Sequence, residues 1–144
     1  MKVSVILLNK GSNDVATIGR SATIADAVRM LAEKRIGALV VSDGNAAIHG
    51  ILSERDIVAA LGTDGAGILE RQVDELMTEN VEACIAEDTA FDVLGRMTAG
   101  RFRHMPVLDA DRKMIGILSI GDVVKARLEE IESENAAMAD MLNG

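Results

Sequence analysis

The chain has 144 residues, and its 15 basic and 23 acidic side chains give a formal net charge of −8. Because 49% of the residues are hydrophobic, we expect a packed interior, in one domain or two small units that share a core, rather than disorder. The acidic balance and the presence of only two aromatic residues, Phe91 and Phe102, argue against a nucleic-acid partner, which needs a basic groove and stacking platforms.

The single cysteine, Cys84, indicates the type of cellular compartment and excludes one class of metal site. It allows no internal disulfide and no zinc site built from a cysteine cluster, so we expect a reducing, cytoplasmic location. The longest early apolar stretch, 5–8, is too short for the core of a secretion signal or for a membrane span, and we expect no membrane partner.

The first half of the chain predicts a strand, a helix, two strands and a second helix. After a short strand over 15–18, apolar residues at 24, 27, 28 and 31 have the spacing of a helix with one buried face. Two apolar runs, 38–41 and 48–52, are joined by turn-forming residues and predict an antiparallel hairpin. A second helix is expected over 54–61.

The glycine-rich stretch 62–67 has two interpretations. A phosphate-binding loop would need a preceding strand and a lysine, which are both missing, so we predict a flexible linker. The acidic amphipathic segment that follows, up to Met77, is expected to be a helix that leads into the second half.

The second half repeats the first at an offset of 66 residues. When 23–60 is laid on 89–126 without a gap, twelve positions are identical, and most others pair one hydrophobic residue with another. The corresponding elements are a strand over 81–85, a helix with apolar residues at 90, 93, 94 and 97, a hairpin of 105–108 with 114–118, and a helix over 120–128. Such a repeat indicates one supersecondary unit used twice.

These elements predict a mixed α/β (α+β) fold of two β-α-β-β-α repeats. One copy is small for independent stability, so we expect the two to pack face to face with pseudo-two-fold symmetry. We divide the chain into a first repeat with an N-terminal segment and linker (1–67), a second repeat with its lead-in helix (68–128) and a C-terminal helical tail (129–144).

The tail continues an apolar heptad pattern. Its seam residues are spaced 4, 3, 4, 3 and 4 positions apart: Val124, Leu128, Ile131, Asn135, Met138 and Leu142. Two interpretations stay open, because such a helix can pair with a second copy of the chain, or it can pack on its own domain or fray.

Ser/Thr-x-x-Asp occurs four times, each time at the start of an expected helix: Thr23/Asp26, Ser53/Asp56, Thr89/Asp92 and Ser119/Asp122. For the two threonine boxes we predict helix capping, in which the hydroxyl accepts a backbone N–H and the carboxylate complements the helix dipole. The two serine boxes directly follow strands that carry Gly50 and Gly116. Glycine there allows an anion to approach the helix start, and a carboxylate can accept ribose hydroxyls, so capping and ribose binding both stay open.

The duplicated unit resembles a known family. Its two Gly-Ile-Leu-Ser-x-x-Asp ends (50–56 and 116–122), Arg-His-Met-Pro-Val-Leu-Asp at 103–109 and Ser-Glu-Arg-Asp-Ile at 53–57 are similar to a tandem pair of CBS domains, a Bateman module, of the small stand-alone bacterial type. The resemblance covers residues 3–128. It implies a regulatory, signal-transducing homodimer that binds an adenosine-containing ligand (AMP, ADP, ATP, NAD(H) or S-adenosylmethionine) in two clefts between the repeats and signals to an unknown protein partner.

By the same resemblance, Asp56 and Asp122 would each hold a ribose, with help from Ser53 and Ser119. Adenine would lie against backbone and small apolar groups of the lead and second strands: Ala16, Thr17, Gly37, Ala38, Val81, Glu82 and Met105. Phosphates would meet basic side chains, mainly those of Arg55, Arg103 and His104. The first repeat has Gly37 and Ala38 where the second has Arg103 and His104, and Arg55 is matched by Gly121, so we expect inequivalent sites, of which the Asp56 site favours a ligand with a charged tail. Which of the two clefts Arg103 and His104 serve stays open, because the clefts would share a centre.

Two other functional classes compete with this interpretation. Ser53, Asp56 and His104 could form an acyl-transfer set, but serine and aspartate three residues apart at a helix start suit capping better. We therefore expect no enzyme, no catalytic residues, no metal site and no catalytic cofactor. A purely structural dimeric adaptor is the other alternative, and it would tolerate the loss of both aspartates.

Overall fold

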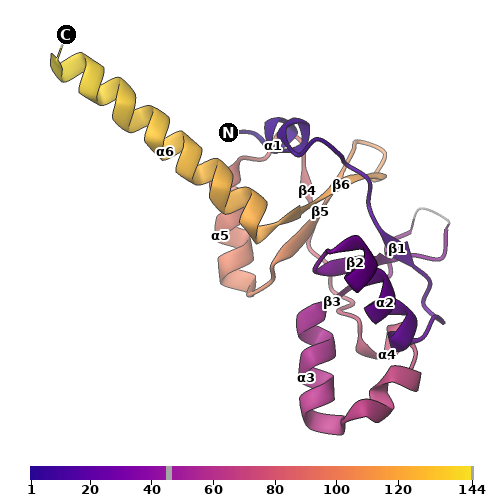
Figure 1. The fold of residues 1–144 in the computed structure, drawn as a ribbon. Coiled ribbons are helices and arrows are strands. Elements are labelled where there is room, and N and C mark those ends of the chain that lie inside the picture. Colours follow the sequence, from indigo (N-terminus) through magenta and orange to yellow (C-terminus); the bar gives the residue numbers. More distant parts are fainter. Residues whose placement is uncertain (45–46, 144) are drawn as a thin grey trace. The chain divides into compact units, whose positions relative to one another are not determined.

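The computed structural model describes residues 1–44 and 47–143, and the chain folds into two compact units. The first unit comprises residues 15–81, and the second joins residues 1–14 to the chain from Glu82 onward. Each unit contains one copy of the repeat and one three-stranded sheet (Figure 1). The predicted mixed α/β fold of two repeats is therefore confirmed.

The first unit follows the predicted order of elements. These are β1 (Thr17–Ile18), α2 (Ile24–Lys34), β2 (Ala38–Val41), β3 (Gly50–Ser53), α3 (Glu54–Asp64), the 3₁₀ helix η1 (Ala66–Glu70) and α4 (Val73–Leu76). β1 runs parallel to β2, and β2 runs antiparallel to β3, as the short hairpin connection requires. Ile24, Ala27 and Leu31 of α2 are buried in the core, as the helical spacing predicts, whereas Val28 is 38% exposed.

The second unit repeats this order and register. Its elements are α1 (Val3–Asn9), β4 (Cys84–Ile85), α5 (Ala90–Gly100), β5 (His104–Leu108), β6 (Met114–Ser119) and α6 (Ile120–Asn143). Ile18 pairs with Val41 in the first unit, and Cys84 pairs with Val107 in the second, so both partners are shifted by the repeat offset of 66. Cys84 thus replaces an isoleucine, and it is packed in the core as a small hydrophobic side chain.

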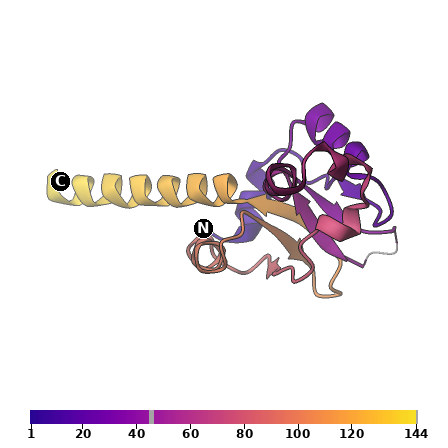
Figure 2. The same ribbon diagram turned by 90° about the horizontal axis from the view of Figure 1, so that it is seen from below.

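Three boundaries differ from the prediction. The lead strands β1 and β4 have only two residues each, because only these residues face partners on β2 or β5. α3 continues into the predicted flexible linker as far as Asp64, and Gly65 follows it with a φ of 77°. α6 continues through the whole described tail as a single helix of 24 residues (Figures 1 and 2).

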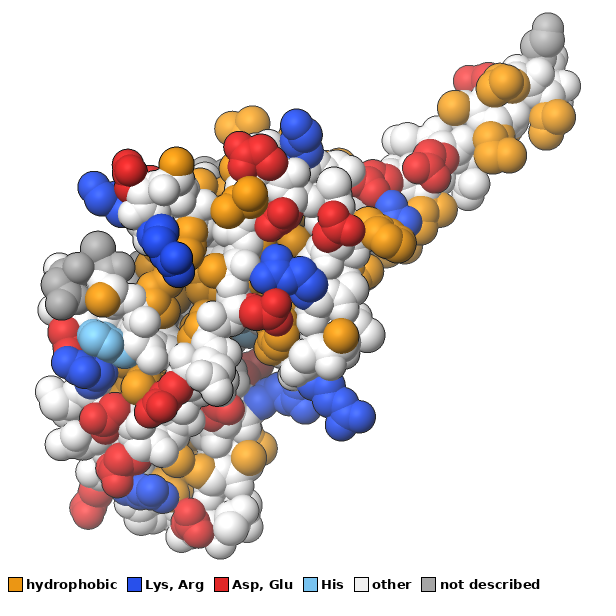
Figure 3. All heavy atoms as spheres, turned by 180° about the vertical axis from the view of Figure 1, so that it is seen from behind, with side chains coloured by type: hydrophobic (Ala, Val, Ile, Leu, Met, Phe, Trp, Pro, Cys, Tyr) orange, Lys and Arg blue, Asp and Glu red, His pale blue; other side chains and the backbone are white. Residues whose placement is uncertain are grey.

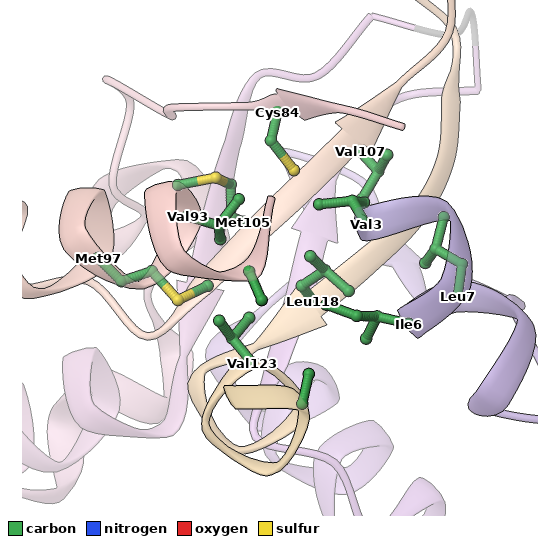
Figure 4. Packing of buried hydrophobic residues seen from close by; sticks show 12 residues of the cluster. Val3, Ile6, Leu7, Cys84, Val93, Met97, Met105, Val107, Leu118 and Val123 are labelled. Atoms are coloured by element: carbon green, nitrogen blue, oxygen red, sulfur yellow. The ribbon is translucent and has the colours of Figure 1, made fainter. Parts of the chain in front are cut away.

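The N-terminal segment packs with the second repeat rather than with the first. Val3, Ile6 and Leu7 of α1 are buried in the same cluster as Leu118 of β6 (Figure 4). Gly116 makes this packing possible, because a Cβ atom at that position would lie 2.8 Å from Leu7 Cδ2. The division that placed residues 1–14 with the first repeat therefore differs from the packing.

The segment 68–81 packs within the first unit, although the sequence division places it with the second repeat. Thr78 exchanges two backbone hydrogen bonds with Ile51 of β3, at 2.9 and 3.0 Å. At Gly50, a Cβ atom would lie 2.6 Å from the Thr78 carbonyl oxygen. The segment belongs to this unit because it pairs with the free edge of β3.

Candidate functional site

The two serine boxes fold as helix caps at equivalent places. Ser53 is the N-cap of α3: Asp56 N–H donates to the Ser53 hydroxyl oxygen at 3.3 Å, and Ser53 N–H donates to Asp56 Oδ2 at 2.9 Å. Ser119 and Asp122 repeat both bonds at the start of α6, at 3.1 and 2.9 Å. Each carboxylate is thereby fixed beside the backbone N–H groups of a helix start that directly follows a strand.

The threonine boxes also cap helices. Asp26 N–H donates to Thr23 Oγ1 at 3.1 Å, and Asp92 N–H donates to Thr89 Oγ1 at 3.2 Å. The capping role predicted for these two boxes is therefore confirmed.

The serine boxes differ in their cationic partners. Lys10 Nζ lies 2.9 Å from Asp122 Oδ2 and donates a hydrogen bond to the Ile117 carbonyl oxygen at 2.7 Å. At Asp56 the additional donor is the hydroxyl of Ser53, 3.0 Å from Oδ2, and none of the described cations of the first unit is paired with Asp56. Lys10 precedes the aligned repeat and belongs to no motif, so the sequence analysis did not single it out.

These contacts decide the charge on Asp122. Burial alone would raise the pKa of this carboxyl, but the Ser119 N–H and the Lys10 ammonium outweigh burial and lower the pKa below its ordinary value of 3.8. Asp122 is therefore ionised at neutral pH, which suits an acceptor of hydroxyl groups.

Two of the expected phosphate-binding residues lie beside the Asp122 box, within the second unit. His104 pairs with Ser119 across β5 and β6. The Arg103 carbonyl oxygen accepts a hydrogen bond from Ile120 N–H, at 2.7 Å. The structure therefore brings the backbone of Arg103 and His104 next to the start of α6.

The first unit has neutral residues at the equivalent places. Ala38 pairs with Ser53 across β2 and β3, and the Gly37 carbonyl oxygen accepts a hydrogen bond from Glu54 N–H at 2.9 Å. Arg55 is exposed on the first turn of α3, directly before Asp56. Within the units, then, Arg55 accompanies Asp56, whereas Arg103 and His104 accompany Asp122.

The structure places the three residues predicted to contact adenine in the second repeat as follows. The Met105 side chain is completely buried in the core of its unit (Figure 4), so any contact with a ligand would involve its backbone. The Glu82 carboxylate is bound by the Arg96 guanidinium at 3.1 Å. Val81 belongs to the first unit and to no strand, because β4 begins only at Cys84.

Ala16 and Thr17 lie at the lead strand of the first repeat. Thr17 is exposed on β1, and Ala16 is half-buried just before it. The Ala16 carbonyl oxygen already accepts a hydrogen bond from Val40 N–H, at 3.0 Å. At this edge, the Thr17 side chain is the more accessible group.

The glycines of β3 and β6 serve the fold. We expected them to let an anion approach, but the space beside Gly50 is filled by Thr78 and Met77, and the space beside Gly116 is filled by Leu7. Glycine is required at these positions because other parts of the same unit pack against the strand.

Three observations concern metal ligands, the cysteine thiol and membrane-spanning helices. Among residues 1–44 and 47–143, no group of three or more His, Cys, Asp or Glu side chains is placed to hold a metal ion. Burial raises the pKa of the Cys84 thiol to about 11, so this thiol is not a nucleophilic thiolate at neutral pH. In the described part of the chain, every helix is too short or too polar to cross a membrane.

Comparisons with known proteins match this architecture. A protein-family model described as "CBS domain" matches residues 11–63 and again residues 73–129. The solved structure of a CBS-domain containing protein from Agrobacterium tumefaciens is 41% identical, with a TM-score of 0.83 over 88% of this chain and 99% of that chain. The solved CBS domain pair of the protein MJ0100, in complex with 5′-methylthioadenosine and S-adenosyl-L-methionine, is 25% identical, with a TM-score of 0.76 over 88% of this chain and 98% of that chain.

A longer plant protein is also similar. The CBS domain-containing protein CBSCBSPB5 from Arabidopsis thaliana is 31% identical over 131 residues, which are 89% of this chain and 24% of the plant protein. The chain thus spans about a quarter of the length of this relative.

Proposed function

The chain belongs to the family of CBS-domain proteins, and on that premise we propose that it is a regulatory module that binds an adenosine-containing ligand at its two serine boxes. One observation carries the proposal. In each repeat an aspartate, Asp56 or Asp122, lies where a strand passes into a helix, and it accepts a hydrogen bond from the backbone N–H of the serine that caps this helix. It is supported by the solved relative, 25% identical, whose CBS domain pair holds two adenosine derivatives.

The geometry of the Asp56 box suits recognition of a ribose. A carboxylate has about four lone-pair sites, and the recorded bonds from Ser53 to Asp56 all go to Oδ2. Among the described residues no donor is recorded on Oδ1 of Asp56, so this oxygen can accept ribose hydroxyls while the capping bond persists. The helix then holds the acceptor in place before the ligand arrives, which reduces the entropic cost of binding.

We further infer that the ligand carries phosphate, as AMP, ATP and NAD(H) do. Arg55 directly precedes Asp56, and Arg103 directly precedes His104, which pairs with Ser119, so each box has an arginine nearby in its own unit. Guanidinium groups bind phosphate oxygens in a bidentate manner, so these arginines suit the phosphates of one nucleotide. S-adenosylmethionine, whose sulfonium is cationic, would gain less from them.

We infer a binding module rather than an enzyme. Ser53 and Asp56 are engaged with each other in the capping box, and the Ser53 hydroxyl donates to Asp56 rather than to a histidine base. In this account, the ligand changes the packing or stability of the module, and a protein partner responds to that change.

We also propose that the chain forms a homodimer through α6. From Ile131 to Asn143 every residue of this helix is exposed, and the apolar seam includes Met138 and Leu142, which are 61% and 84% exposed. Figure 3 shows hydrophobic side chains on the surface of the projecting helix. A helix of about a dozen residues without packing is marginal in water, so a partner helix is expected to cover it. The heptad spacing, with Asn135 in the seam, suits a second copy of the same helix in parallel orientation.

Thermal denaturation in the presence of candidate ligands tests the ligand proposal. AMP, ATP, NADH and S-adenosylmethionine are compared with GMP, which carries the same ribose and phosphate but another base. A ligand at 100 times its dissociation constant should stabilise the protein by about 2.7 kcal/mol. The proposal requires a shift with at least one adenosine compound and a smaller shift with GMP, and the absence of any shift would refute it.

A further inference from the structure

We infer that Lys10 is a specificity-determining residue that makes the two serine boxes inequivalent. Its ammonium group is paired with Asp122 Oδ2, so a ligand at that box meets a carboxylate whose charge is already compensated by a cation. The additional donor at Asp56 is the neutral hydroxyl of Ser53. This inference rests on the proposed function and assigns a role to a residue outside the repeated sequence.

The position of Lys10 is fixed by the packing of α1. Val3 N–H and Ser4 N–H donate to the carbonyl oxygens of Asp88 and Ala86, at 2.8 and 3.0 Å. Val3, Ile6 and Leu7 of α1 are buried in the core of the second unit (Figure 4), whereas Val5 and Leu8 are exposed. Lys10 follows directly as the C-cap residue of the helix, so its side chain is held within reach of β6 and the start of α6.

The contacts of Lys10 make Asp122 a weaker acceptor for ribose hydroxyls. Its Nζ atom lies 2.9 Å from Asp122 Oδ2 and 2.7 Å from the Ile117 carbonyl oxygen, and both side chains of the ion pair are only about one-quarter exposed (26% and 25%). A hydrogen bond from a cation to a carboxylate is stronger than one from a neutral hydroxyl. Ribose hydroxyls therefore gain less at Asp122 than at a carboxylate without a cation.

The equivalent contact at Asp56 is easier to replace. There the additional donor is the Ser53 hydroxyl, which is neutral and can rotate away. The chain that packs beside β3 at Gly50 is Met77–Thr78, which carries no positive charge. The difference between the boxes thus comes from the segments that flank the repeats and not from the repeats themselves.

The surroundings of Lys10 allow it to move away. A hollow of about 270 Å³ lies between α1 and α6, and its lining includes Asn9, Lys10, Asp122 and Lys125. Lys10 can therefore leave Asp122 without displacing packed side chains. The ion pair lies at the edge of this hollow and not in the core of the unit.

Calorimetric titration with AMP tests the inference in a protein that keeps only the Asp122 box. The Asp56→Asn variant keeps an oxygen acceptor for Ser53 N–H and weakens the first box. Adding Lys10→Met should tighten AMP binding by about threefold to tenfold, the range expected when a partly exposed ion pair no longer competes. Lys2→Met, which removes the same charge from an exposed residue of the same segment, should change the affinity less than about twofold.

The outcomes separate this inference from the proposed function. Unchanged or weaker AMP binding after Lys10→Met would overturn the inference, because Lys10 would then be neutral or part of the ligand site, while nucleotide binding itself would stand. If neither the wild-type protein nor any variant binds AMP or the other adenosine ligands, the proposed function fails and the inference fails with it. Carboxyl NMR of Asp122 gives a second readout without ligand: the pKa should rise in Lys10→Met and stay unchanged in Lys2→Met.

Discussion

Asp56 and Asp122 each accept a backbone hydrogen bond in a capping box, and we assign the same carboxylates to ligand binding. A substitution at either aspartate therefore changes helix stability together with binding. Ser53 allows the two roles to be separated, because its side-chain oxygen makes the reciprocal bond of the cap.

Ser53→Ala is expected to lower the free energy of unfolding by about 1 kcal/mol, because the first turn of α3 loses its side-chain cap. Urea denaturation measures this change. Ser133→Ala is the matched control, since Ser133 is exposed within α6 and alanine favours a helix there. Equal stability of Ser53→Ala and the wild type would contradict the capping role.

The lowered pKa of Asp122 predicts a pH dependence of stability. Its charged form is favoured in the folded state, so the contribution is complete above the ordinary pKa of 3.8 and is lost as the pH falls through the lower folded value. Urea denaturation of the wild type and Asp122→Asn should show the larger stability difference at pH 6 and a smaller one at about pH 3. A difference that stays the same at both pH values would contradict the assignment.

At the scale of elements, flanking segments complete each repeat, and glycine at one position of each hairpin makes room for them. The two positions differ in what occupies that room. Beside Gly50 lies the backbone carbonyl of Thr78, whereas beside Gly116 lies the end of the Leu7 side chain.

This contrast predicts unequal effects of alanine at the two glycines. Gly50→Ala should destabilise the protein by about 1–3 kcal/mol, because a backbone oxygen 2.6 Å from the new Cβ can move only with its whole segment. Gly116→Ala should cost less, because the Leu7 methyl group can rotate away. Chemical denaturation of both variants measures the difference, and an equal or larger loss for Gly116→Ala would disprove this explanation.

The tail predicts a change in oligomeric state. Met138→Glu places a charge in the apolar seam of α6 and should convert a dimer into a monomer with the chain mass of 15.3 kDa by light scattering. Ala137→Glu adds the same charge to an exposed position outside the seam and should leave the dimer intact. A dimer that persists in Met138→Glu, or a monomeric wild type, would exclude pairing through the tail.

At the scale of the whole molecule, the sequence predicts the repeated part well and the flanking parts poorly. The element order and the capping boxes follow from periodicity and from the offset of 66, because each repeat carries both signals twice. Lead strands of two residues are too short for any alternation pattern, which is why Val81 was placed in a strand.

The packing of the flanking segments has no comparable local signal. α1 has seven residues and no side-chain cap, so its buried face at Val3, Ile6 and Leu7 resembles an ordinary short apolar run. The ion pair of Lys10 with Asp122 joins residues 112 positions apart, outside any motif. Such contacts depend on tertiary packing. The repeated sequence therefore predicts the two serine boxes of the candidate site, but it does not predict the lysine beside Asp122.

Equilibrium binding of labelled AMP shows whether the two serine boxes bind an adenosine ligand. The wild-type protein is compared with the double variant Asp56→Asn, Asp122→Asn, after circular dichroism has shown that the variant is folded. We predict saturable binding to the wild type and at least a tenfold weaker association with the folded double variant. Equal binding of AMP to both proteins, or no binding to the wild type at ligand concentrations in the millimolar range, would contradict the account.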